Sequence, residues 1–264
     1  MKKSEVFLYI IMIISTIVII APFLWLVKLS LSPDIRSVFR SEIIFDHYIY
    51  IFSGVPLIWI KNSLIVAFGG TLIVFLLSLF GGYALERYEF KGKGVGGFYM
   101  ALTFIPTIAI LVPLLGYMVM LKLYNTLYAL IIVSAAFNTP FSTWLMKSVI
   151  HTMPREIEEA AMLDGCSPFK VLYKFVIPTC ASGMAFIFTY IFIMIWNSYA
   201  FAFALVPDPD LKILPMGLLG TMEGDPRGGI AWTQGAAMGI IMVLPTIIVF
   251  SIAQKWVGRI FKIK

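Results

Sequence analysis

The charged side chains that could serve a function gather in one segment, residues 154–178, between two long apolar stretches. Four acidic residues lie in the first half of this segment. The whole sequence has only two histidines and two cysteines, and none of them has the spacing of metal ligands. Gly92-Lys93-Gly94 lacks the upstream glycine and the downstream Ser or Thr of a phosphate-binding loop. The segment is therefore suited to recognition and not to catalysis, and no catalytic residue is expected.

This segment predicts two short helices that meet at a turn on the membrane surface. Pro154 suits the first position of a helix, and Gly165 permits the left-handed residue that ends it. Ser167 and Pro168 suit the start of the second helix, and Pro178 is expected at the bend into the next apolar stretch. Hydrophobic residues of the second helix recur at helical spacing and are expected to share one face: Phe169, Leu172, Tyr173 and Val176. An ordinary solvated loop with some helix fits the same residues.

The elements around this segment are apolar enough to lie in lipid. Hydrophobic residues make up 60% and charged residues 13% of the 264 residues, whereas a soluble domain is about half apolar and a quarter charged. The chain is therefore expected to be all-α, a single polytopic membrane domain of residues 1–264. Its six predicted transmembrane helices are residues 6–27, 63–85, 98–121, 127–146, 181–206 and 234–254. Pro106 and Pro113 predict that the third of these is bent or broken.

The distribution of positive charge predicts the orientation in the membrane. Most of the 20 Lys and Arg residues lie in segments that face the cytoplasm if the N-terminus does. We therefore expect a multi-pass protein of the inner (cytoplasmic) membrane, with both termini and residues 154–178 inside. Because the net charge of +6 is sorted by side of the membrane, it does not indicate nucleic acid. Cys166 and Cys180 are expected as free thiols, and His47 and His151 as solvated side chains.

The six predicted spans contain no Asp, Glu, Lys, Arg or His. Ion-coupled carriers usually need an ionisable group at membrane depth, so the energy for any transport is expected to come from outside the spans. Because the chain has no nucleotide-binding loop, a motor would belong to a partner that docks on residues 154–178. A secondary carrier or channel without an ATPase is the rival from another class. A membrane enzyme is disfavoured because no nucleophile, base and metal set converges.

A longer pattern in the polar segment resembles a known family. Glu159-Ala160-Ala161, then Gly165, then an apolar-x-apolar-Pro sequence ending at Pro178, is similar to the EAA loop of ABC importer permeases. Phe175 and Ile177 stand where that family usually has Ile and Leu. Further similarity to the maltose-type carbohydrate permeases covers nearly the whole chain: Pro22-Phe23-Leu24-Trp25, Tyr83-Ala84-Leu85-Glu86-Arg87-Tyr88, Trp196-Asn197-Ser198, Leu244-Pro245 and Gln254.

The resemblance implies a cytoplasmic coupling-helix loop between spans 4 and 5 that docks on ABC ATPase subunits. ATP and Mg would be held by those subunits, and no cofactor is expected in this chain. A second homologous permease subunit and an extracytoplasmic solute-binding protein are further implied partners. The loop of residues 207–233 is the implied contact for the binding protein, although a solvated connector fits it equally well. The implied coupling residues are Glu158, Glu159, Ala160, Ala161, Asp164, Gly165 and Pro178.

Polar residues inside the predicted spans are candidates for a solute path. Amides and hydroxyls beside aromatic rings suit an uncharged carbohydrate, because rings cover its apolar faces while amides pair with its hydroxyls. The candidates are Asn138, Thr139, Thr189, Trp196, Asn197, Ser198 and Tyr199. Such residues also join helices to one another or satisfy carbonyls freed by proline. A polyamine- or phosphate-type permease is the rival within the class, and the lack of acidic groups in the spans favours a neutral solute.

Overall fold

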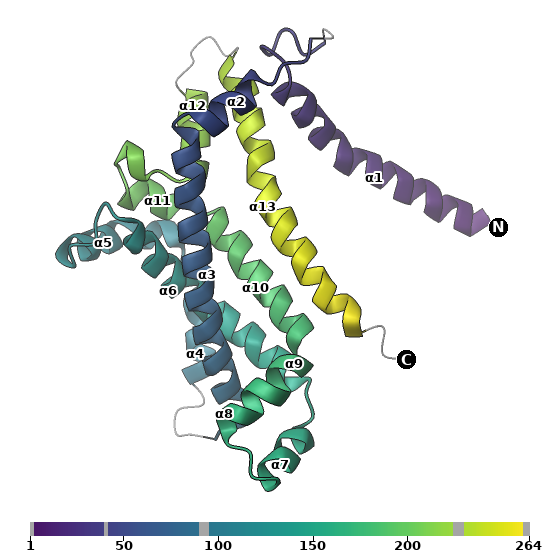
Figure 1. Ribbon diagram of the computed structural model, residues 1–264, viewed down its shortest axis with the longest axis vertical. Coiled ribbons are helices and arrows are strands. Elements are labelled where there is room, and N and C mark those ends of the chain that lie inside the picture. Colours follow the sequence, from purple (N-terminus) through teal and green to yellow (C-terminus); the bar gives the residue numbers. More distant parts are fainter. Residues whose placement is uncertain (1–2, 40–41, 90–94, 224–229, 261–264) are drawn as a thin grey trace. The chain divides into compact units, whose positions relative to one another are not determined.

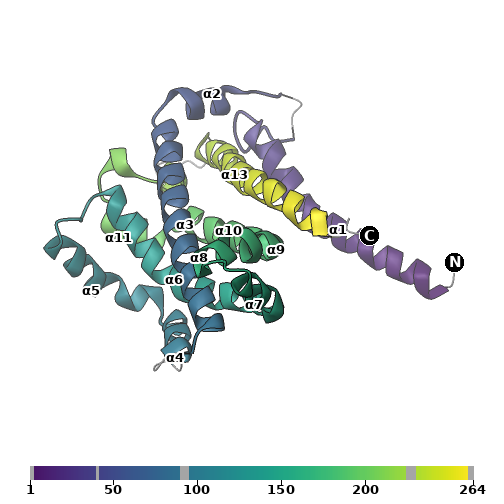
Figure 2. The ribbon, with the colours of Figure 1, turned by 60° about the horizontal axis from the view of Figure 1, so that its bottom comes forward.

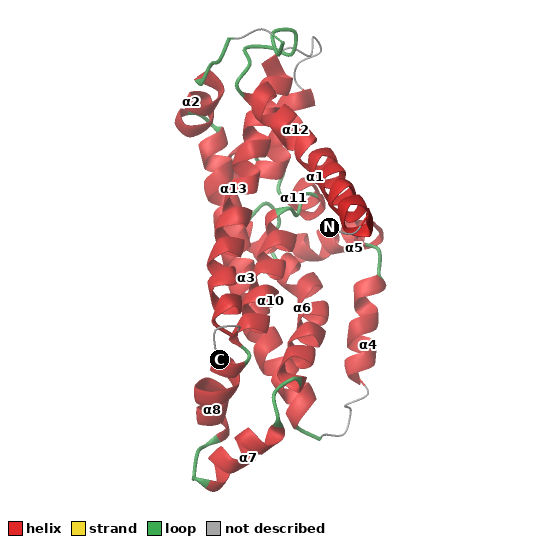
Figure 3. Cartoon of the chain, turned by 90° about the vertical axis from the view of Figure 1, so that its right-hand side faces the viewer, coloured by secondary structure: helices red, strands yellow, loops and turns green. Residues whose placement is uncertain are grey.

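The computed structural model describes residues 3–39, 42–89, 95–223 and 230–260, which form helices and loops and contain no strand (Figures 1 and 3). The expectation of an all-α chain is confirmed. The chain divides into two compact units. The first comprises residues 1–58 and 214–244, and the second comprises residues 59–213 and 245–264.

The described helices, in chain order, are α1 Lys3–Ser30, α2 Asp46–Ser53, α3 Pro56–Arg87, α4 Val95–Ala101, η1 Leu102–Phe104, α5 Thr107–Met120, α6 Leu127–His151, α7 Arg155–Leu163, α8 Pro168–Val171, η2 Leu172–Val176, α9 Ile177–Thr179, α10 Ala181–Trp196, α11 Ala200–Leu205, η3 Pro209–Leu211, α12 Leu214–Glu223 and α13 Ile230–Ile260. Here η1 and η3 are 3₁₀-helices and η2 is a π-helix.

Four described helices are long and apolar enough to cross a membrane, and they lie in α1, α3, α6 and α13. A fifth candidate exists if residues 168–179 and α10, which are bent by 83° at Cys180, form one span. The count of six spans therefore remains a prediction. α3 and α6 also run past the predicted span ends at residues 85 and 146, and the parts beyond those ends carry Glu86, Arg87, Lys147 and His151.

The predicted third and fifth spans are each broken in the structure. Before Pro106 the chain leaves the helical region, because Ile105 has φ −72° and ψ 122°, the extended geometry that a residue before proline favours. The break separates α4 and η1 from α5, so the predicted break is confirmed at Pro106, whereas Pro113 lies inside α5. The predicted span 181–206 is interrupted because α10 ends at Trp196 and a new helix, α11, begins at Ala200 after three intervening residues.

Close helix packing builds the second unit, in which α10 lies beside α6 (Figure 2). Small residues permit the approach of the backbones. A side chain added at Gly70 of α3 would meet Ile195 of α10, and one added at Gly183 of α10 would meet Val149 of α6. Large side chains such as Trp196 fill the space between the helices and are fully buried.

The first unit contains a core in which Leu26 and Leu29 of α1 pack against Val38 and Ala236. In α2, the side chain of His47 packs inward. The ring is only 4% exposed, and its Nε2 atom lies 2.9 Å from the backbone oxygen of Ser32. The expectation that His47 is solvated is therefore wrong, because the short helix buries one face against the preceding loop.

We expect Gly82→Ala to lower the free energy of unfolding by about 1–3 kcal/mol, the usual cost of overpacking. The new Cβ would lie 2.8 Å from both the backbone nitrogen of Lys147 and the Cβ of Met146, and a backbone atom cannot move aside cheaply. Gly116→Ala is the matched control, because nothing lies within 4 Å of that added Cβ. Thermal unfolding of the purified variants in detergent measures both, and equal midpoints would contradict the proposed α3–α6 contact.

Candidate functional site

The turn that ends α7 has the geometry that the sequence predicted. Gly165 has φ +83°, a left-handed value that favours glycine. Its N–H donates to the backbone oxygen of Met162, and the N–H of Cys166 donates to that of Ala161, which together make a Schellman motif. Pro168 then stands at the first position of α8. Backbone geometry therefore fixes where the two short helices meet.

The expected common face of the second helix is wrong. Val171, Leu172 and Val176 are buried, whereas Phe169 and Tyr173 are 75% and 71% exposed. The cause is η2, a π-helical turn, which adds residues to each turn and shifts the spacing that brings side chains to one face. Pro178 follows η2 after one residue, Ile177, and has no N–H to donate to the turn before it. Two large apolar side chains are thereby left pointing outward.

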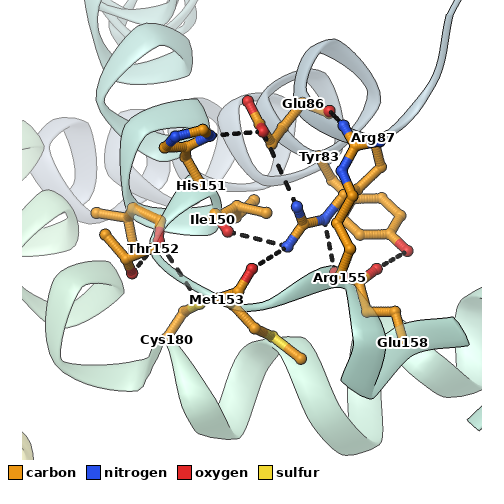
Figure 4. Close-up of polar contacts among 11 residues, drawn as sticks. Tyr83, Glu86, Arg87, Ile150, His151, Thr152, Met153, Arg155, Glu158 and Cys180 are labelled. Atoms are coloured by element: carbon orange, nitrogen blue, oxygen red, sulfur yellow. Dashed lines mark hydrogen bonds and ion pairs between the residues drawn. The ribbon is translucent and has the colours of Figure 1, made fainter. Parts of the chain in front are cut away.

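A buried ion pair joins α7 to the end of α3 (Figure 4). Arg87 Nε donates to Glu158 Oε1 at 2.6 Å, and Tyr83 Oη donates to Glu158 Oε2 at 2.9 Å. Arg87 Nη2 also donates to the backbone oxygens of Ile150 and Met153, at 3.0 and 2.9 Å. The guanidinium group therefore holds three parts of the chain together: α3, the end of α6, and α7.

A second set of contacts surrounds this pair and centres on Glu86. His151 Nδ1 lies 2.8 Å from Glu86 Oε1, and Arg155 Nη2 donates to the backbone oxygen of Glu86 at 2.7 Å (Figure 4). Arg87 Nη1 lies 3.9 Å from the same carboxylate. The His151 side chain is exposed, as expected, but it has an acidic partner that the sequence analysis missed.

The predicted coupling residues divide into two groups. Glu158 and Ala161 are buried against the rest of the second unit. The others are exposed: Glu159, Ala160, Asp164, Gly165 and Pro178. Sequence reasoning treated the two adjacent glutamates alike, and it gave Arg87 no role because its partner lies 71 residues away. The adjacent acidic and basic residues at the end of an apolar helix, Glu86 and Arg87, were the sequence feature that could have indicated a structural role for Arg87.

Exposed apolar side chains surround the turn between α7 and α8. Leu163, the last residue of α7, is 89% exposed, and Phe169 of α8 and Tyr173 of η2 are exposed on the other side of the turn in the chain. Ile157 and Met162 of α7 are each 41% exposed. Exposed apolar side chains that gather on an otherwise polar segment mark a surface that contacts another protein or a membrane. We call these five residues the loop surface.

Two of the predicted solute residues share a hollow of about 360 Å³. Asn138 of α6 and Ser198, which follows α10, both line it. The Asn138 amide donates to the backbone oxygen of Ser134 at 2.8 Å, so its own carbonyl oxygen is available to a ligand. The remaining lining combines hydroxyl-bearing residues with aromatic rings, including Thr103, Thr107, Tyr190, Phe137, Phe141 and Phe201.

The other predicted solute residues lie apart from this hollow. Thr139 and Thr189 are buried and donate to backbone oxygens within their own helices. Trp196 is 1% exposed and stacks on Phe192, so its ring faces the core. Asn197 is exposed and donates to a backbone oxygen of α10, and Tyr199 stacks on Phe203. Thr189 also lines a larger hollow of about 400 Å³, whose other walls are apolar.

The loop of residues 207–233 contains helices that were not expected, η3 and α12. In the second unit its first part is held to α3: Asn62 Nδ2 donates to the backbone oxygens of Asp210 and Lys212, at 2.9 and 3.0 Å. Residues 224–229, where much of the implied contact with a binding protein falls, lie outside the described residues.

Comparison with known proteins shows which family of proteins the chain belongs to. Residues 1–262 match the family described as the binding-protein-dependent transport system inner membrane component, and the chain belongs to that family. It is therefore a multi-pass membrane protein and a transport component, not an enzyme.

Individual relatives agree with the family. The chain is 30% identical to the inner membrane ABC transporter permease protein YcjP of Escherichia coli, over 80% of this chain and 76% of the relative. It is 28% identical to the trehalose/maltose transport system permease protein MalG of Thermococcus litoralis, over 93% and 90%. The fold matches a bacterial ABC transporter involved in the import of the acidic polysaccharide alginate, with a TM-score of 0.80 at 21% identity, over 97% and 98% of the two chains.

We expect Arg87→Met to destabilise the second unit by about 3–5 kcal/mol, because Glu158 would remain as a buried charge without its cation. Glu159→Gln is the matched control, since that exposed carboxylate makes no contact with Arg87, and we expect a change within about 0.5 kcal/mol. Thermal unfolding measures both effects. Maleimide labelling of Cys180, which is buried in the native state, reports whether the loop itself is released.

An Arg87→Met protein with wild-type stability and a protected Cys180 would show that the ion pair does not hold the loop. The double variant Arg87→Met with Glu158→Met is expected to recover only part of the loss, because the backbone oxygens of Ile150 and Met153 still lack their donor.

Proposed function

We propose that this chain is a permease subunit of a binding-protein-dependent ABC importer and forms half of the translocation path for a carbohydrate. It pairs with a second, homologous permease subunit, and cytoplasmic ATPase subunits dock on the α7–α8 segment. An extracytoplasmic solute-binding protein delivers the substrate. The observation that carries this proposal is the loop surface, an exposed apolar patch on a polar segment that the buried Arg87–Glu158 pair holds to the membrane helices.

The loop surface has the composition of a docking site. Aromatic and aliphatic side chains that become fully desolvated supply most of the energy of protein interfaces, and Phe169, Tyr173 and Leu163 are of this kind. Glu159 and Asp164 are exposed beside them and can fix orientation through charge. Within the proposed importer, these side chains contact the ATPase, while Glu158 holds the loop and does not reach the partner.

The proposed orientation places both termini and the α7–α8 segment in the cytoplasm. Its support is the sequence bias of Lys and Arg together with the place of the loop surface, since cytoplasmic ATPases can reach only that side. The six-span arrangement counts α1, α3, α6 and α13 as four spans. The broken segments α4–α5 and α10–α11 supply the other two.

A carbohydrate fits the hollow at Asn138 better than the larger one at Thr189. Aromatic rings cover the apolar faces of a sugar, and amide and hydroxyl groups pair with its hydroxyls. Phe137, Phe141 and Tyr190 supply rings beside Asn138 and Ser198. Within the larger hollow, the Thr189 hydroxyl donates to its own helix and the remaining walls are apolar. The names of relatives point to the same substrate class, because one serves trehalose/maltose transport.

We expect Glu159→Lys to weaken binding of the ATPase subunits while leaving membrane insertion intact. Leu163→Asp is expected to act in the same way, because it places a charge in the centre of the loop surface. The measurement is the amount of nucleotide-binding subunit that co-purifies with the tagged chain, together with ATP-dependent uptake. Glu42→Lys is the control for charge reversal, since Glu42 is exposed and lies in the loop before α2.

Normal co-purification and uptake in both loop variants would overturn the proposed docking site. If uptake also persisted without nucleotide, a secondary carrier would replace the ABC importer as the function.

For the solute hollow, we expect Asn138→Leu to raise the KM of uptake by roughly five- to tenfold, the effect of losing one hydrogen bond of about 1–1.5 kcal/mol. The expected cause is the loss of the Asn138 amide oxygen as a hydrogen-bond acceptor in the lining of the hollow. Asn197→Leu is the matched control, because Asn197 is exposed and does not line this hollow. Equal effects of the two substitutions would show that the hollow does not select the solute.

For the binding-protein contact, we expect deletion of residues 222–229 to abolish stimulation of ATPase activity by the binding protein and to spare the basal rate. The acidic residues of the 207–233 loop support a polar, charge-guided contact of this kind. The test compares ATPase activity of the reconstituted transporter with and without the binding protein. Unchanged stimulation would rule the contact out.

A further inference from the structure

A second polar hollow lies at the end of α6 and has no part in the proposed solute path. Its volume is about 360 Å³, and it is lined by Glu86, Trp144, Lys147, Ser148, His151 and Arg155. Four of these residues lie on one face of α6, because their spacing is i, i+3, i+4 and i+7: Trp144, Lys147, Ser148 and His151. We call it the basic hollow, because it presents two permanent cations and one histidine.

The basic hollow adjoins a narrower one of about 190 Å³. Trp144 and Lys147 line both, so the two share a wall. The narrower hollow continues along α6 with Pro140 and Thr143, and apart from Lys147 its lining residues are uncharged, Leu85 and Met100 among them. The pair therefore has a charged end near the terminus of α6 and a less polar end toward its middle.

The electrostatics of the basic hollow favour an anion. Lys147 is half-buried, and within the described parts of the chain its ammonium group makes no hydrogen bond or ion pair. The one carboxylate in the wall, Glu86, is already engaged by His151 and Arg87. Arg155 uses Nη2 on a backbone oxygen and keeps further N–H donors. A half-buried cation without a partner is costly, and an anion would satisfy it.

The position of the basic hollow indicates what kind of anion it takes. It lies at the end of a helix that is long and apolar enough to span the membrane, on the side proposed to be cytoplasmic. Trp144 is 42% exposed beside it, and tryptophan is enriched where membrane meets water. Basic pockets on the cytoplasmic side, with apolar surface leading into the membrane, are suited to anionic lipid headgroups.

We propose that the basic hollow binds the headgroup of an anionic phospholipid from the cytoplasmic leaflet. The lipid phosphate pairs with Lys147, and its acyl chain runs past Trp144 toward the narrower hollow. The site lies directly beside the Glu86–Arg87 contacts, so the bound lipid adjoins the network that holds the α7–α8 segment. The proposal uses the proposed cytoplasmic orientation and does not depend on which solute is transported.

The test uses Trp144 as its own reporter. The chain, with the subunits that co-purify with it, is reconstituted into phosphatidylcholine vesicles that contain a minor fraction of either brominated phosphatidylglycerol or brominated phosphatidylcholine. Bromine quenches a nearby indole, and the signal of Trp144 is the difference between wild type and Trp144→Phe. We expect brominated phosphatidylglycerol to quench the Trp144 fluorescence more strongly than brominated phosphatidylcholine. Lys147→Gln is expected to reduce this preference about fivefold, and Lys147→Arg to keep it.

Lys170→Gln is the matched control, because Lys170 is an exposed cation on α8 outside the basic hollow. Native mass spectrometry of wild type and Lys147→Gln counts bound phosphatidylglycerol without relying on Trp144→Phe. Fewer retained lipids in Lys147→Gln alone would support the site.

Four outcomes would overturn the proposal. The first two are equal quenching by the two brominated lipids and an equal loss of preference in Lys170→Gln. The third is removal of the quenching by inorganic phosphate, which would indicate a site for a free ion. The fourth is absence of quenching by either lipid, which would indicate that protein covers the hollow. None of these results bears on the binding of the ATPase subunits, so failure here is distinguishable from failure of the proposed function.

Discussion

The arrangement of the second unit at the end that carries α7 depends on one buried cation, Arg87. A guanidinium group removed from water is tolerated only where its donors are satisfied, and Arg87 meets that condition with one carboxylate and two backbone oxygens. Because these acceptors belong to different helices, satisfying the cation also fixes those helices to one another. A lysine could not replace it, since a single ammonium cannot present the same planar set of donors.

The two neighbouring glutamates of α7 show how one turn of helix can serve both the interior and a partner. Consecutive positions point about 100° apart, so Glu158 reaches Arg87 while Glu159 faces solvent. The second short helix is divided in the same way at its π-helical turn. Leu172 and Val176 are buried there, whereas Phe169 and Tyr173 are exposed. Side chains that anchor the segment and side chains that are free to contact the proposed partner thus lie within a few residues of one another.

The sequence predicted those features that depend on local backbone chemistry. Gly165 and Pro168 act through their own φ angles and missing N–H group, so the turn could be placed without the structure. The Arg87–Glu158 contact could not be predicted, because it joins positions 71 residues apart that only helix packing brings together. The π-helical turn was missed for a related reason, since the 3.6-residue period assumes regular hydrogen bonding. Among the polar span residues, spacing alone could not separate Asn138 from the buried Trp196.

α6 is a single helix from the Arg87 contacts to the hollow at Asn138. Thirteen residues separate His151 from Asn138, which is about 20 Å at 1.5 Å per residue. In the proposed importer, a displacement of the α7–α8 segment would reach the hollow through this helix as through a rigid rod, and a shift of one end would tilt the other. Pro140, which lacks an N–H for the helical ladder, sits where such a rod would flex. The linkage is mechanical and needs no chain of rearranging side chains between the two ends.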